Sequence, residues 1–357
     1  MESAPGTPRA PGTGSAPVTR TSVRGGQMVV PASRAAEAGA ALVRRWVPEG
    51  DLDLGLTLGP LRRGPGDPAF RVSADGAVWR ASRTPEGPGT IRIARSGTEV
   101  VAEAWGPGGP WLLDGLPALL GADDDPSVFV PRHRLVHEAH RRHPGLRLCR
   151  TGLVLESLIP SVLEQKVTSD EAYRGWRLLL QRFGEPAPGP GAEGPSLDGA
   201  GRRGTEGSER LRVMPDARGW ALIPSWEWHR AGVDAKRAAA VVRAVRAARR
   251  LEEAAGMPSA EAAARLQLIP GIGPWTAAET LQRSNGCPDA ITVGDLHLPR
   301  IIGYALTGRR GLDDAAMLEL LEPYAGQRHR AARLVLLSGR VPERRAPRFS
   351  VRDFRAM

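Results

Sequence analysis

The sequence has little cysteine. Its 357 residues include two cysteines, Cys149 and Cys287, which lie far apart and form no CxxC motif. Two such residues supply neither a disulfide framework nor the four thiolates of an iron–sulfur cluster or a structural zinc site. This usage fits a reducing compartment, and we therefore expect a cytoplasmic protein.

Long hydrophobic runs are also missing. The nearest candidate, residues 35–43, is short and contains Glu37, whereas a membrane-spanning helix needs about 20 apolar residues. The N-terminus has no continuous apolar segment of the kind that signal peptides contain. We therefore expect a soluble protein without a membrane partner.

Acidic residues are fewer than basic ones. The chain has 49 Lys and Arg against 39 Asp and Glu, a net charge of +10 and an isoelectric point near 10.8. This balance favours a polyanionic partner, because binding to nucleic acid releases its condensed counterions. A composition rich in Arg, Ala and Gly raises the isoelectric point by itself, so charge alone does not establish nucleic-acid binding. The 41% of hydrophobic residues is ordinary for a globular protein, and the length allows two domains.

The N-terminal part of the chain predicts a tail followed by a sheet domain. Residues 1–30 are mainly Pro, Gly, Ser, Thr and Arg, which bury too little apolar surface to offset the entropy of ordering, so we expect a disordered tail. Alternating hydrophobicity then favours short antiparallel strands and one packed helix, giving an α/β domain over 36–125. The expected strands are 51–58, 77–82, 90–94 and 99–105, and the expected helix is 111–120.

From residue 131 the hydrophobic period becomes helical. This pattern predicts a second, all-α domain over 131–340, interrupted at 185–212 by a Pro- and Gly-rich flexible insertion and followed by a basic tail over 341–357. The expected helices are 131–143, 154–166, 169–183, 234–254, 259–268, 274–284, 313–322 and 328–338.

A Gly- and Pro-rich turn, IPGIGPW, joins two of these helices. Pro270, Gly271 and Gly273 prevent one continuous helix but permit a tight turn, which predicts a helix-hairpin-helix. The amides of the two glycines would face outward at a helix N-terminus and could hold a DNA phosphate independently of base sequence, with nearby carbonyls holding a monovalent cation. A plain turn between helices is the alternative.

About twenty residues later, Asp295 stands in the apolar segment ITVGDLHL. Hydrolysis of an N-glycosidic bond in DNA builds positive charge on the sugar, which a nearby carboxylate can stabilise while it orients a water molecule. A base made cationic by alkylation leaves as a neutral molecule and needs no general acid, unlike the leaving group of ordinary glycosides. Alternatively, Asp295 only caps the helix that Leu296 begins.

The hairpin and the following Gly294-Asp295 together resemble the helix-hairpin-helix base-excision glycosylases, in particular the DNA-3-methyladenine glycosylase II (AlkA-like) group. The segments WRASRTPEG, WGPGG, SLIPSVLEQKV and EPYAGQRHRAARL extend the likeness over most of the chain. The resemblance implies an α+β fold, with a small N-terminal antiparallel-sheet domain and a larger all-α helix-hairpin-helix glycosylase domain. It also implies a cleft between helical subdomains that receives a flipped base.

The resemblance assigns roles to residues of the hairpin and of the segment that follows it. Asp295 corresponds to the catalytic aspartate. The implied DNA-binding residues are Gly271, Ile272, Gly273, Lys166 and Arg328. Lys166 follows Gln165, near the position of the residue that fills the gap left by the flipped base, and Arg328 belongs to a basic motif. No cofactor is implied apart from Na⁺ or K⁺ held with DNA by the backbone carbonyls of Gln267, Ile269 and Ile272.

Trp275 bears on the type of reaction. Relatives that also cleave the DNA backbone carry a Schiff-base lysine at this position, so the resemblance implies a monofunctional hydrolase. The indole could stack on a cationic base or pack in the core. Glu279 replaces an aromatic of some relatives and no tryptophan stands near Leu336, so Tyr173 and Trp226 are candidate replacements in the base pocket, with core packing as their alternative.

Two sets of basic residues remain. Arg243, Arg246 and Arg250 share one face of the predicted 234–254 helix, which is either a DNA surface or a solvated face. His133, His137 and His140 also share a helix face, but no metal-binding signature accompanies them.

The leading hypothesis is a monofunctional DNA N-glycosylase that removes alkylated bases of the 3-methyladenine type in base-excision repair. We expect it to act as a monomer on double-stranded DNA that contains damaged bases, associated with the nucleoid through that DNA. A glycosylase for oxidised or deaminated bases and a non-enzymatic helix-hairpin-helix DNA-binding protein are the alternatives.

Overall fold

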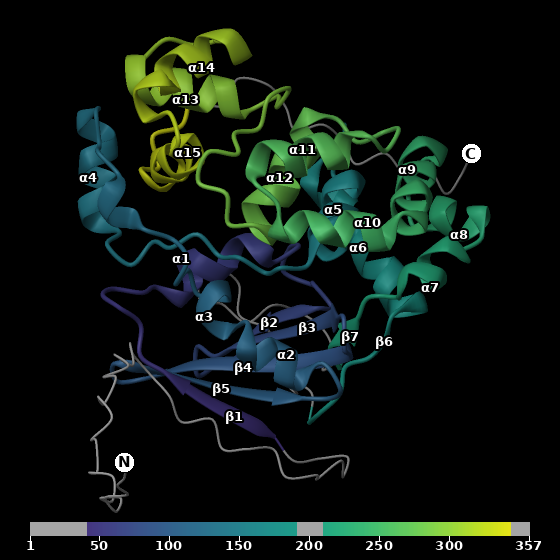
Figure 1. The fold of residues 1–357 in the computed structure, drawn as a ribbon. Coiled ribbons are helices and arrows are strands. Elements are labelled where there is room, and N and C mark those ends of the chain that lie inside the picture. The colour runs from purple at the N-terminus through teal and green to yellow at the C-terminus, as the bar shows by residue number, and fades with distance from the viewer. Residues whose placement is uncertain (1–40, 191–209, 344–357) are drawn as a thin grey trace, which may run out of the picture.

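The computed structural model describes residues 41–190 and 210–343 of the protein. The predicted tail at 1–30, the centre of the predicted insertion and most of the basic C-terminal stretch lie outside these ranges. Figure 1 shows a sheet at one end of the molecule and helices covering the other. Within the described ranges, no helix combines the length and apolarity that crossing a bilayer requires.

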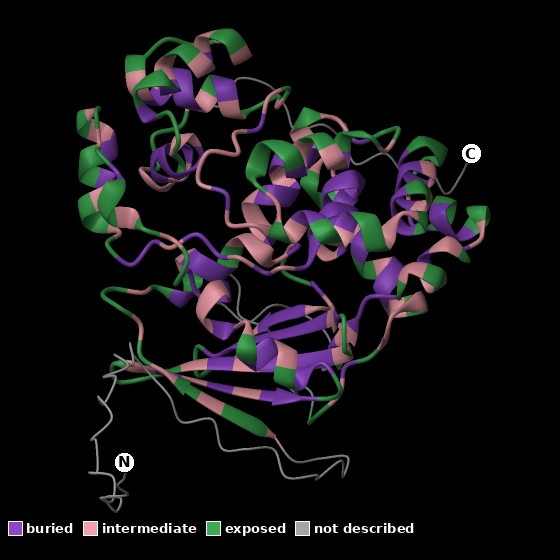
Figure 2. Cartoon of the chain, in the orientation of Figure 1, coloured by how far each residue is buried: buried purple, intermediate pink, exposed green. Residues whose placement is uncertain are grey.

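A five-stranded antiparallel sheet forms the N-terminal part, with the strand order β1-β5-β4-β3-β2. The strands are β1 (Leu42–Trp46), β2 (Phe70–Val72), β3 (Val78–Thr84), β4 (Gly87–Ser96) and β5 (Glu99–Trp105). Apolar residues of the central strands pack against α2 (Gly109–Asp114) and α3 (Leu116–Leu119), and Figure 2 shows this burial in the sheet. Gly115 separates the two helices where the sequence predicts a single one.

The predicted strand over 51–58 is wrong, because Leu54–Leu58 forms the helix α1. Asp53 caps this helix, since its Oδ1 accepts a hydrogen bond from the amide of Leu56 at 2.9 Å. Leu54 and Leu58, which are four residues apart, are both buried in the core under the sheet. In this segment leucines at every second position are also four residues apart, a spacing that suits one face of a helix. The cap that Asp53 supplies favours the helix over the strand.

The helices form two groups with separate hydrophobic cores. The larger group comprises α5 (Val154–Leu163), α6 (Ser169–Phe183), α7 (Ala217–Ala221), α8 (Ser225–Arg230), α9 (Ala235–Arg246), α10 (Ala248–Glu252), α11 (Ser259–Gln267) and α12 (Pro274–Ser284). The smaller group comprises α4 (Arg134–Arg142), α13 (Leu298–Thr307), α14 (Asp314–Leu321) and α15 (Arg328–Leu337). Both lie on the same side of the sheet in Figure 1. The predicted helix over 234–254 is thus divided into α9 and α10.

Buried polar contacts fasten the sheet to the helices. Arg80 of β3 forms an ion pair with Glu156 of α5, and the indole N–H of Trp176 on α6 donates to Asp67 at 2.9 Å. A short ribbon of β6 (Glu185–Pro186) and β7 (Arg212–Val213), at the two ends of the predicted insertion, shares a small apolar cluster with β3 and β5. These contacts hold α5 and α6 at a fixed position relative to the sheet.

Candidate active site

The predicted hairpin is present between α11 and α12. Gly271 adopts a left-handed φ of +100°, and a Cβ atom at this position would lie 2.9 Å from the Cβ of Ala240, so both the turn and the close approach of α9 require glycine. Two side chains hold the turn. Gln165 donates to the carbonyl of Gly271 at 2.9 Å and to Thr276 Oγ1 at 2.7 Å, and Arg243 donates to the carbonyl of Pro270 at 2.9 Å.

The hairpin leaves backbone donors free to bind an anion. Among the described residues, the amides of Gly271 and Gly273 have no hydrogen-bond acceptor. Gly273 directly precedes α12, so both amides lie at the positive end of that helix. The guanidinium of Arg243 is exposed and stands beside Gly271. The arrangement can bind a phosphate through two amides and one cationic side chain, and the sequence did not identify Arg243 as part of it.

Asp295 is contacted from two directions. Its Oδ2 accepts a hydrogen bond from the indole N–H of Trp275 at 3.0 Å, and its Oδ1 accepts from the amides of His297 at 2.7 Å and Leu298 at 2.8 Å. The amides belong to the start of α13. Asp295 therefore accepts from the first amides of α13, but this helix begins at Leu298, with His297 at its N-cap, and not at Leu296 as the capping interpretation expected. The other carboxylate oxygen is oriented by the residue that follows the hairpin.

The backbone just before Asp295 is held by a second acidic residue. Gly294 has a left-handed φ of +85°, and its amide donates to Oδ2 of Asp314 at 2.8 Å. Asp314 lies in the first turn of α14, so the loop that carries Asp295 is fastened to the smaller helical group. Asp295 is thus fixed from both helical groups.

Asp295 lines a cavity of about 400 Å³ between the two helical groups, a size within the range of roughly 300–1,000 Å³ typical of ligand sites. Residues from both groups form its wall, and among the described residues no Trp, Tyr or Phe side chain lines it. The wall residues are Pro60, Leu148, Cys149, Glu279, Gln282, Arg283, Ile291, Thr292, Asp295, His297, Leu298, Ile301, His329, Ala332, Arg333 and Leu336.

The wall of this cavity contains buried ionisable groups. Glu279 and Arg283, one turn apart on α12, form an ion pair at 2.7 Å with side chains 15% and 14% exposed. Burial, reinforced by the charges of Arg333, Arg283 and Arg330, places the pKa of His329 well below its usual value, so this histidine is neutral at pH 7. Burial also lowers the pKa of Arg333. The sequence offered a signal only for Glu279, which stands one helical turn after Trp275.

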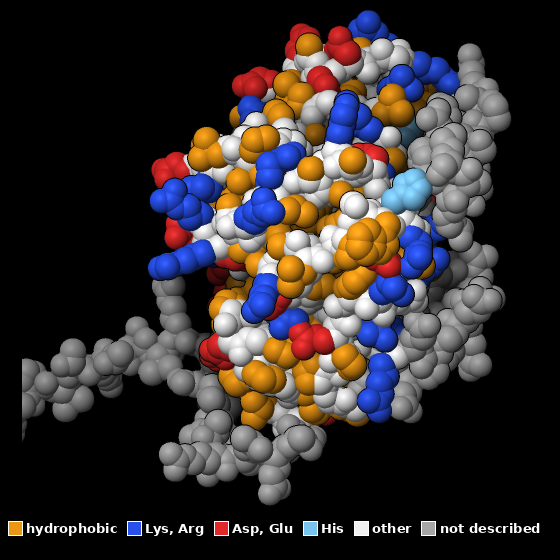
Figure 3. All heavy atoms as spheres, turned by 90° about the vertical axis from the view of Figure 1, so that its right-hand side faces the viewer, with side chains coloured by type: hydrophobic (Ala, Val, Ile, Leu, Met, Phe, Trp, Pro, Cys, Tyr) orange, Lys and Arg blue, Asp and Glu red, His pale blue; other side chains and the backbone are white. Residues whose placement is uncertain are grey.

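None of the three predicted pocket aromatics lines the cavity, although Trp275 bonds to Asp295 at its edge through the indole N–H. Trp226 is 64% exposed on α8 and does not line the cavity, which corrects the prediction. On the side of the molecule that carries α7, α8 and α9, Figure 3 shows basic side chains interspersed with hydrophobic ones. Tyr173 packs against Gly64 and is also outside the cavity wall. Burial, followed by the charge of Glu164, raises the pKa of Tyr173.

The basic motif at the start of α15 is engaged within the protein. Arg328 forms ion pairs with Asp289 at 2.7 Å and Glu322 at 3.4 Å. Arg330 is 1% exposed and pairs with the buried Asp124, so it cannot reach a phosphate. Arg330 therefore supports the fold, whereas the DNA contact of Arg328, whose side chain is 26% exposed, stays a prediction. Lys166, in contrast, is exposed next to Gln165 and has a left-handed φ of 56°, an uncommon conformation for a residue with a side chain.

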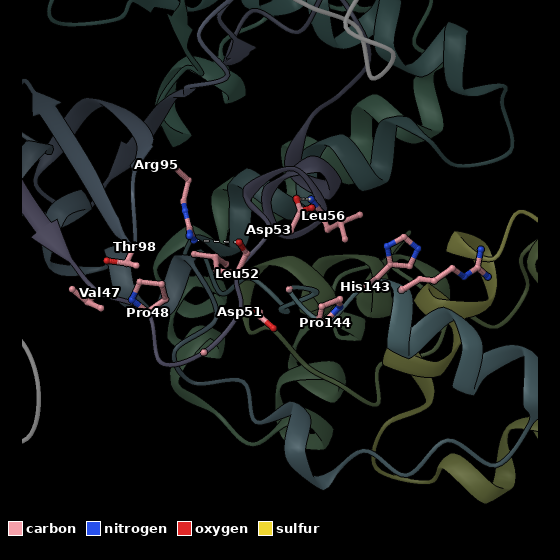
Figure 4. Close-up of a pocket in the computed structure, with 13 residues that line it drawn as sticks. Val47, Pro48, Asp51, Leu52, Asp53, Leu56, Arg95, Thr98, His143 and Pro144 are labelled. Atoms are coloured by element: carbon pink, nitrogen blue, oxygen red, sulfur yellow. Dashed lines mark hydrogen bonds between the residues drawn. The ribbon is translucent and has the colours of Figure 1, made fainter.

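A different cavity, of about 550 Å³, lies between the segment before α1, the β4–β5 turn and the end of α4. In Figure 4 the guanidinium of Arg95 reaches the carbonyl of Leu52, to which it donates at 3.3 Å. Asp53, which also lines this cavity, is already used as the cap of α1. None of the predicted site residues lines it, and we therefore assign the candidate active site to the cavity beside Asp295.

The hairpin carbonyls were tested against the expected monovalent cation. Ile269 accepts from the amide of Ile272 at 3.0 Å, and the carbonyls of Gln267 and Ile272 accept no hydrogen bond in the described part of the chain. Free carbonyl oxygens suit Na⁺ or K⁺, so Gln267 and Ile272 fit the expected site, while the carbonyl of Ile269 is already bonded and the site stays a prediction. No group of three or more His, Cys, Asp or Glu side chains that could hold a metal occurs in residues 41–190 and 210–343.

The sequence matches no protein-family model and no curated protein sequence. The structure, however, is similar to those of several DNA glycosylases. MBOgg1 bound to a low-affinity DNA ligand shares 16% identity at a TM-score of 0.63, over 85% of this chain and 96% of its own. The 3-methyladenine DNA-glycosylase from Archaeoglobus fulgidus shares 17% identity at a TM-score of 0.62, over 82% of this chain and 96% of its own.

A third similar structure is the 8-oxoguanine glycosylase/lyase of Clostridium acetobutylicum in complex with DNA, with 12% identity at a TM-score of 0.60 over 84% of this chain and 95% of its own. The three matches span both the sheet and the helices. The protein therefore has the α+β fold of the helix-hairpin-helix DNA glycosylases.

Proposed function

We propose that the protein is a monofunctional DNA N-glycosylase that removes alkylated bases of the 3-methyladenine type in base-excision repair. One observation carries the proposal: Asp295, oriented by Trp275, lines a cavity of about 400 Å³ on the same stretch of chain as a hairpin with two free amides. The similarity to the 3-methyladenine DNA-glycosylase from Archaeoglobus fulgidus supports this substrate class.

In the proposed reaction the damaged nucleotide leaves the duplex and its base enters the cavity. As the glycosidic bond breaks, the Asp295 carboxylate stabilises the positive charge that develops on the sugar and orients the attacking water. The amides of His297 and Leu298 fix one of its oxygens and Trp275 donates to the other, so little reorganisation is needed. An alkylated, cationic base departs neutral and takes no proton from the protein.

Double-stranded DNA is the proposed partner of the hairpin face. The free amides of Gly271 and Gly273 and the guanidinium of Arg243 bind a phosphate near the damaged nucleotide. The exposed Lys166 enters or flanks the gap that the flipped base leaves in the duplex. Carbonyls of Gln267, Ile269 and Ile272 would hold a monovalent cation that neutralises the same phosphate. The protein acts as a monomer, located with the DNA in the cytoplasm.

The absence of lyase activity is part of the proposal. A lyase needs an amine that forms a Schiff base with the abasic sugar, and the residue beside Asp295 is Trp275, whose indole N–H is bonded to the carboxylate. Lys166 and Lys236 are the only lysines in the sequence. Lys236 lies in the first turn of α9, whose N-terminus is capped by Asp234.

A second candidate is a glycosylase for oxidised or deaminated bases. The guanidinium of Arg333 lines the cavity and could donate to a base carbonyl, and the 8-oxoguanine glycosylase/lyase has the same fold. A panel of duplexes with single lesions decides between the two: the alkylation model predicts release of 3-methyladenine and little release of 8-oxoguanine or hypoxanthine. If no duplex in the panel loses a base, the protein is a DNA-binding protein and the proposal is wrong.

A further inference from the structure

Glu279 occupies a distinctive place in the cavity. It lies one turn after Trp275 on α12 and lines the same wall as Asp295. Its Oε2 accepts from Arg283 at 2.7 Å. Within the described residues, Oε1 has no hydrogen-bond partner and is not among the buried atoms that lack one. One oxygen is thus anchored and the other is free to accept from a ligand in the cavity.

The anchor is rigid. Arg283 donates from Nε to the carbonyl of Pro60 at 2.9 Å, and from Nη1 to both the carbonyl and the carboxylate of Glu279 at 2.7 Å. The Arg283 charge offsets that of Glu279, so Oε1 acts as an oriented acceptor more than as an unpaired charge. A fixed acceptor in a poorly solvated wall discriminates strongly, because an unsuitable ligand leaves it unsatisfied.

Glu279 and Asp295 are the two carboxylates among the described residues that line the cavity. Gln282 donates from Nε2 to the carbonyl of Ala290 at 2.7 Å, so its amide oxygen is a neutral acceptor. Arg333 donates to the carbonyl of Leu56 at 3.0 Å and has no acceptor atom. Each oxygen of Asp295 already accepts from the protein, Oδ2 from Trp275 and Oδ1 from the α13 amides. Among the described residues, Glu279 is therefore the wall carboxylate with an oxygen that accepts no hydrogen bond from the protein.

We propose that Glu279 determines specificity by accepting a hydrogen bond from an N–H group on the edge of the flipped base. It thereby selects 6-aminopurines over 6-oxopurines, whose carbonyl would face the carboxylate oxygen. This inference rests on the proposed function, because it requires that the cavity receive the base. Selection by an unfavourable contact with the wrong base is as effective here as attraction of the right one.

The test compares two bases in one variant. Glu279→Gln keeps the shape and an acceptor for Arg283 but adds an amide that can donate to a carbonyl. Single-turnover release of 3-methyladenine from methylated duplex DNA and of hypoxanthine from a single-lesion duplex is measured for both proteins. We expect the ratio of the two rates to fall at least tenfold in the variant. Glu261→Gln, an exposed carboxylate of α11, is the matched control and leaves the ratio unchanged.

Two further variants keep the test decisive if Glu279→Gln folds poorly by its melting curve. Glu279→Met, which has no strong acceptor, should also lose the preference, whereas Glu279→Asp should retain it at a lower rate. Equal loss of both rates in Glu279→Gln or Glu279→Met, with an unchanged ratio, would show a purely structural role and overturn the inference. A wild-type protein that releases no base from any duplex would instead overturn the proposed function.

Discussion

The indole N–H of Trp275 donates to Oδ2 of Asp295 at 3.0 Å, although the two residues are twenty positions apart, Trp275 in the first turn of α12 and Asp295 in the connection between α12 and α13. The hydrogen bond joins the helix that follows the hairpin to the loop that carries the carboxylate. The residue next to the phosphate-binding turn therefore also sets the direction in which the carboxylate points.

Loss of this hydrogen bond should slow base release. Trp275→Phe keeps an aromatic ring but removes the donor, and a hydrogen bond to a charged group contributes roughly 1.5–3 kcal/mol. We expect single-turnover base release to fall about 10- to 100-fold, while the affinity for duplex DNA changes little. Trp226→Phe, at the 64% exposed tryptophan of α8, serves as the control with wild-type rates. An unchanged rate in Trp275→Phe would show that the indole does not orient the carboxylate.

Arg243 should contribute to phosphate binding beside the hairpin. Arg243→Ala removes the guanidinium next to Gly271, so we expect weaker binding to every duplex, damaged or not, and a slope of log affinity against log salt that is smaller by about 1. The measurement is a salt titration by fluorescence anisotropy. Arg246→Ala, an exposed arginine of the same helix, is the control. If both variants bind equally, Arg243 is an ordinary solvated residue.

The protein should form no covalent complex with abasic DNA. With tryptophan at the position beside Asp295, borohydride added during base release should trap no protein–DNA adduct. If an adduct does form, the sequence allows its amine to be identified quickly, because Lys166→Arg and Lys236→Arg remove the two lysines in turn. Loss of the adduct in Lys166→Arg would contradict the monofunctional assignment and would place the amine of Lys166 in the gap that the flipped base leaves in the duplex.

The stability of the protein should fall below neutral pH because of His329. Its pKa in the folded protein is depressed by burial and by neighbouring arginines, while in the unfolded chain it is about 6.5. Below that pH the unfolded state takes up a proton that the folded state does not, so the free energy of unfolding falls by up to about 1.4 kcal/mol per pH unit.

Denaturant unfolding between pH 7.5 and 5.5 measures this effect. His329→Gln should lose stability less steeply over this range than the wild type, whereas His229→Gln, at an exposed histidine of α8, should follow the wild type. Parallel curves for the wild type and His329→Gln would mean that His329 titrates normally in the folded protein.

The features that local sequence determines were predicted well. Glycine and proline at 270–274 require a turn, and the helices on either side were predicted within about a residue of α11 and α12. Long periodic segments such as α6 and the alternating strand β5 were equally clear. The edge strands β1 and β2 were missed, because they are short and β1 carries two arginines with no clear alternation.

Contacts between distant segments could not be predicted. Nothing in the local pattern distinguishes Arg330, buried against Asp124, from a surface arginine that could bind phosphate. The exposure of Trp226 and the burial of its neighbour Trp228 follow from how α8 packs on the larger helical core. The pairing of Glu279 with Arg283 has helical spacing, but its position on the cavity wall depends on the second helical group.

Asp295 is the residue on which the proposed catalysis depends most. Asp295→Asn keeps the shape of the side chain, and its amide oxygen can still accept from the amides of His297 and Leu298, so the cap of α13 and the melting temperature should be largely retained. The decisive measurement is single-turnover release of base from methylated duplex DNA by this variant, with its DNA affinity measured in parallel. We predict that base release falls at least 100-fold while binding stays within a few-fold of the wild type, because the charge is needed only in the transition state. Base release at the wild-type rate would contradict the catalytic assignment and leave Asp295 as a helix cap.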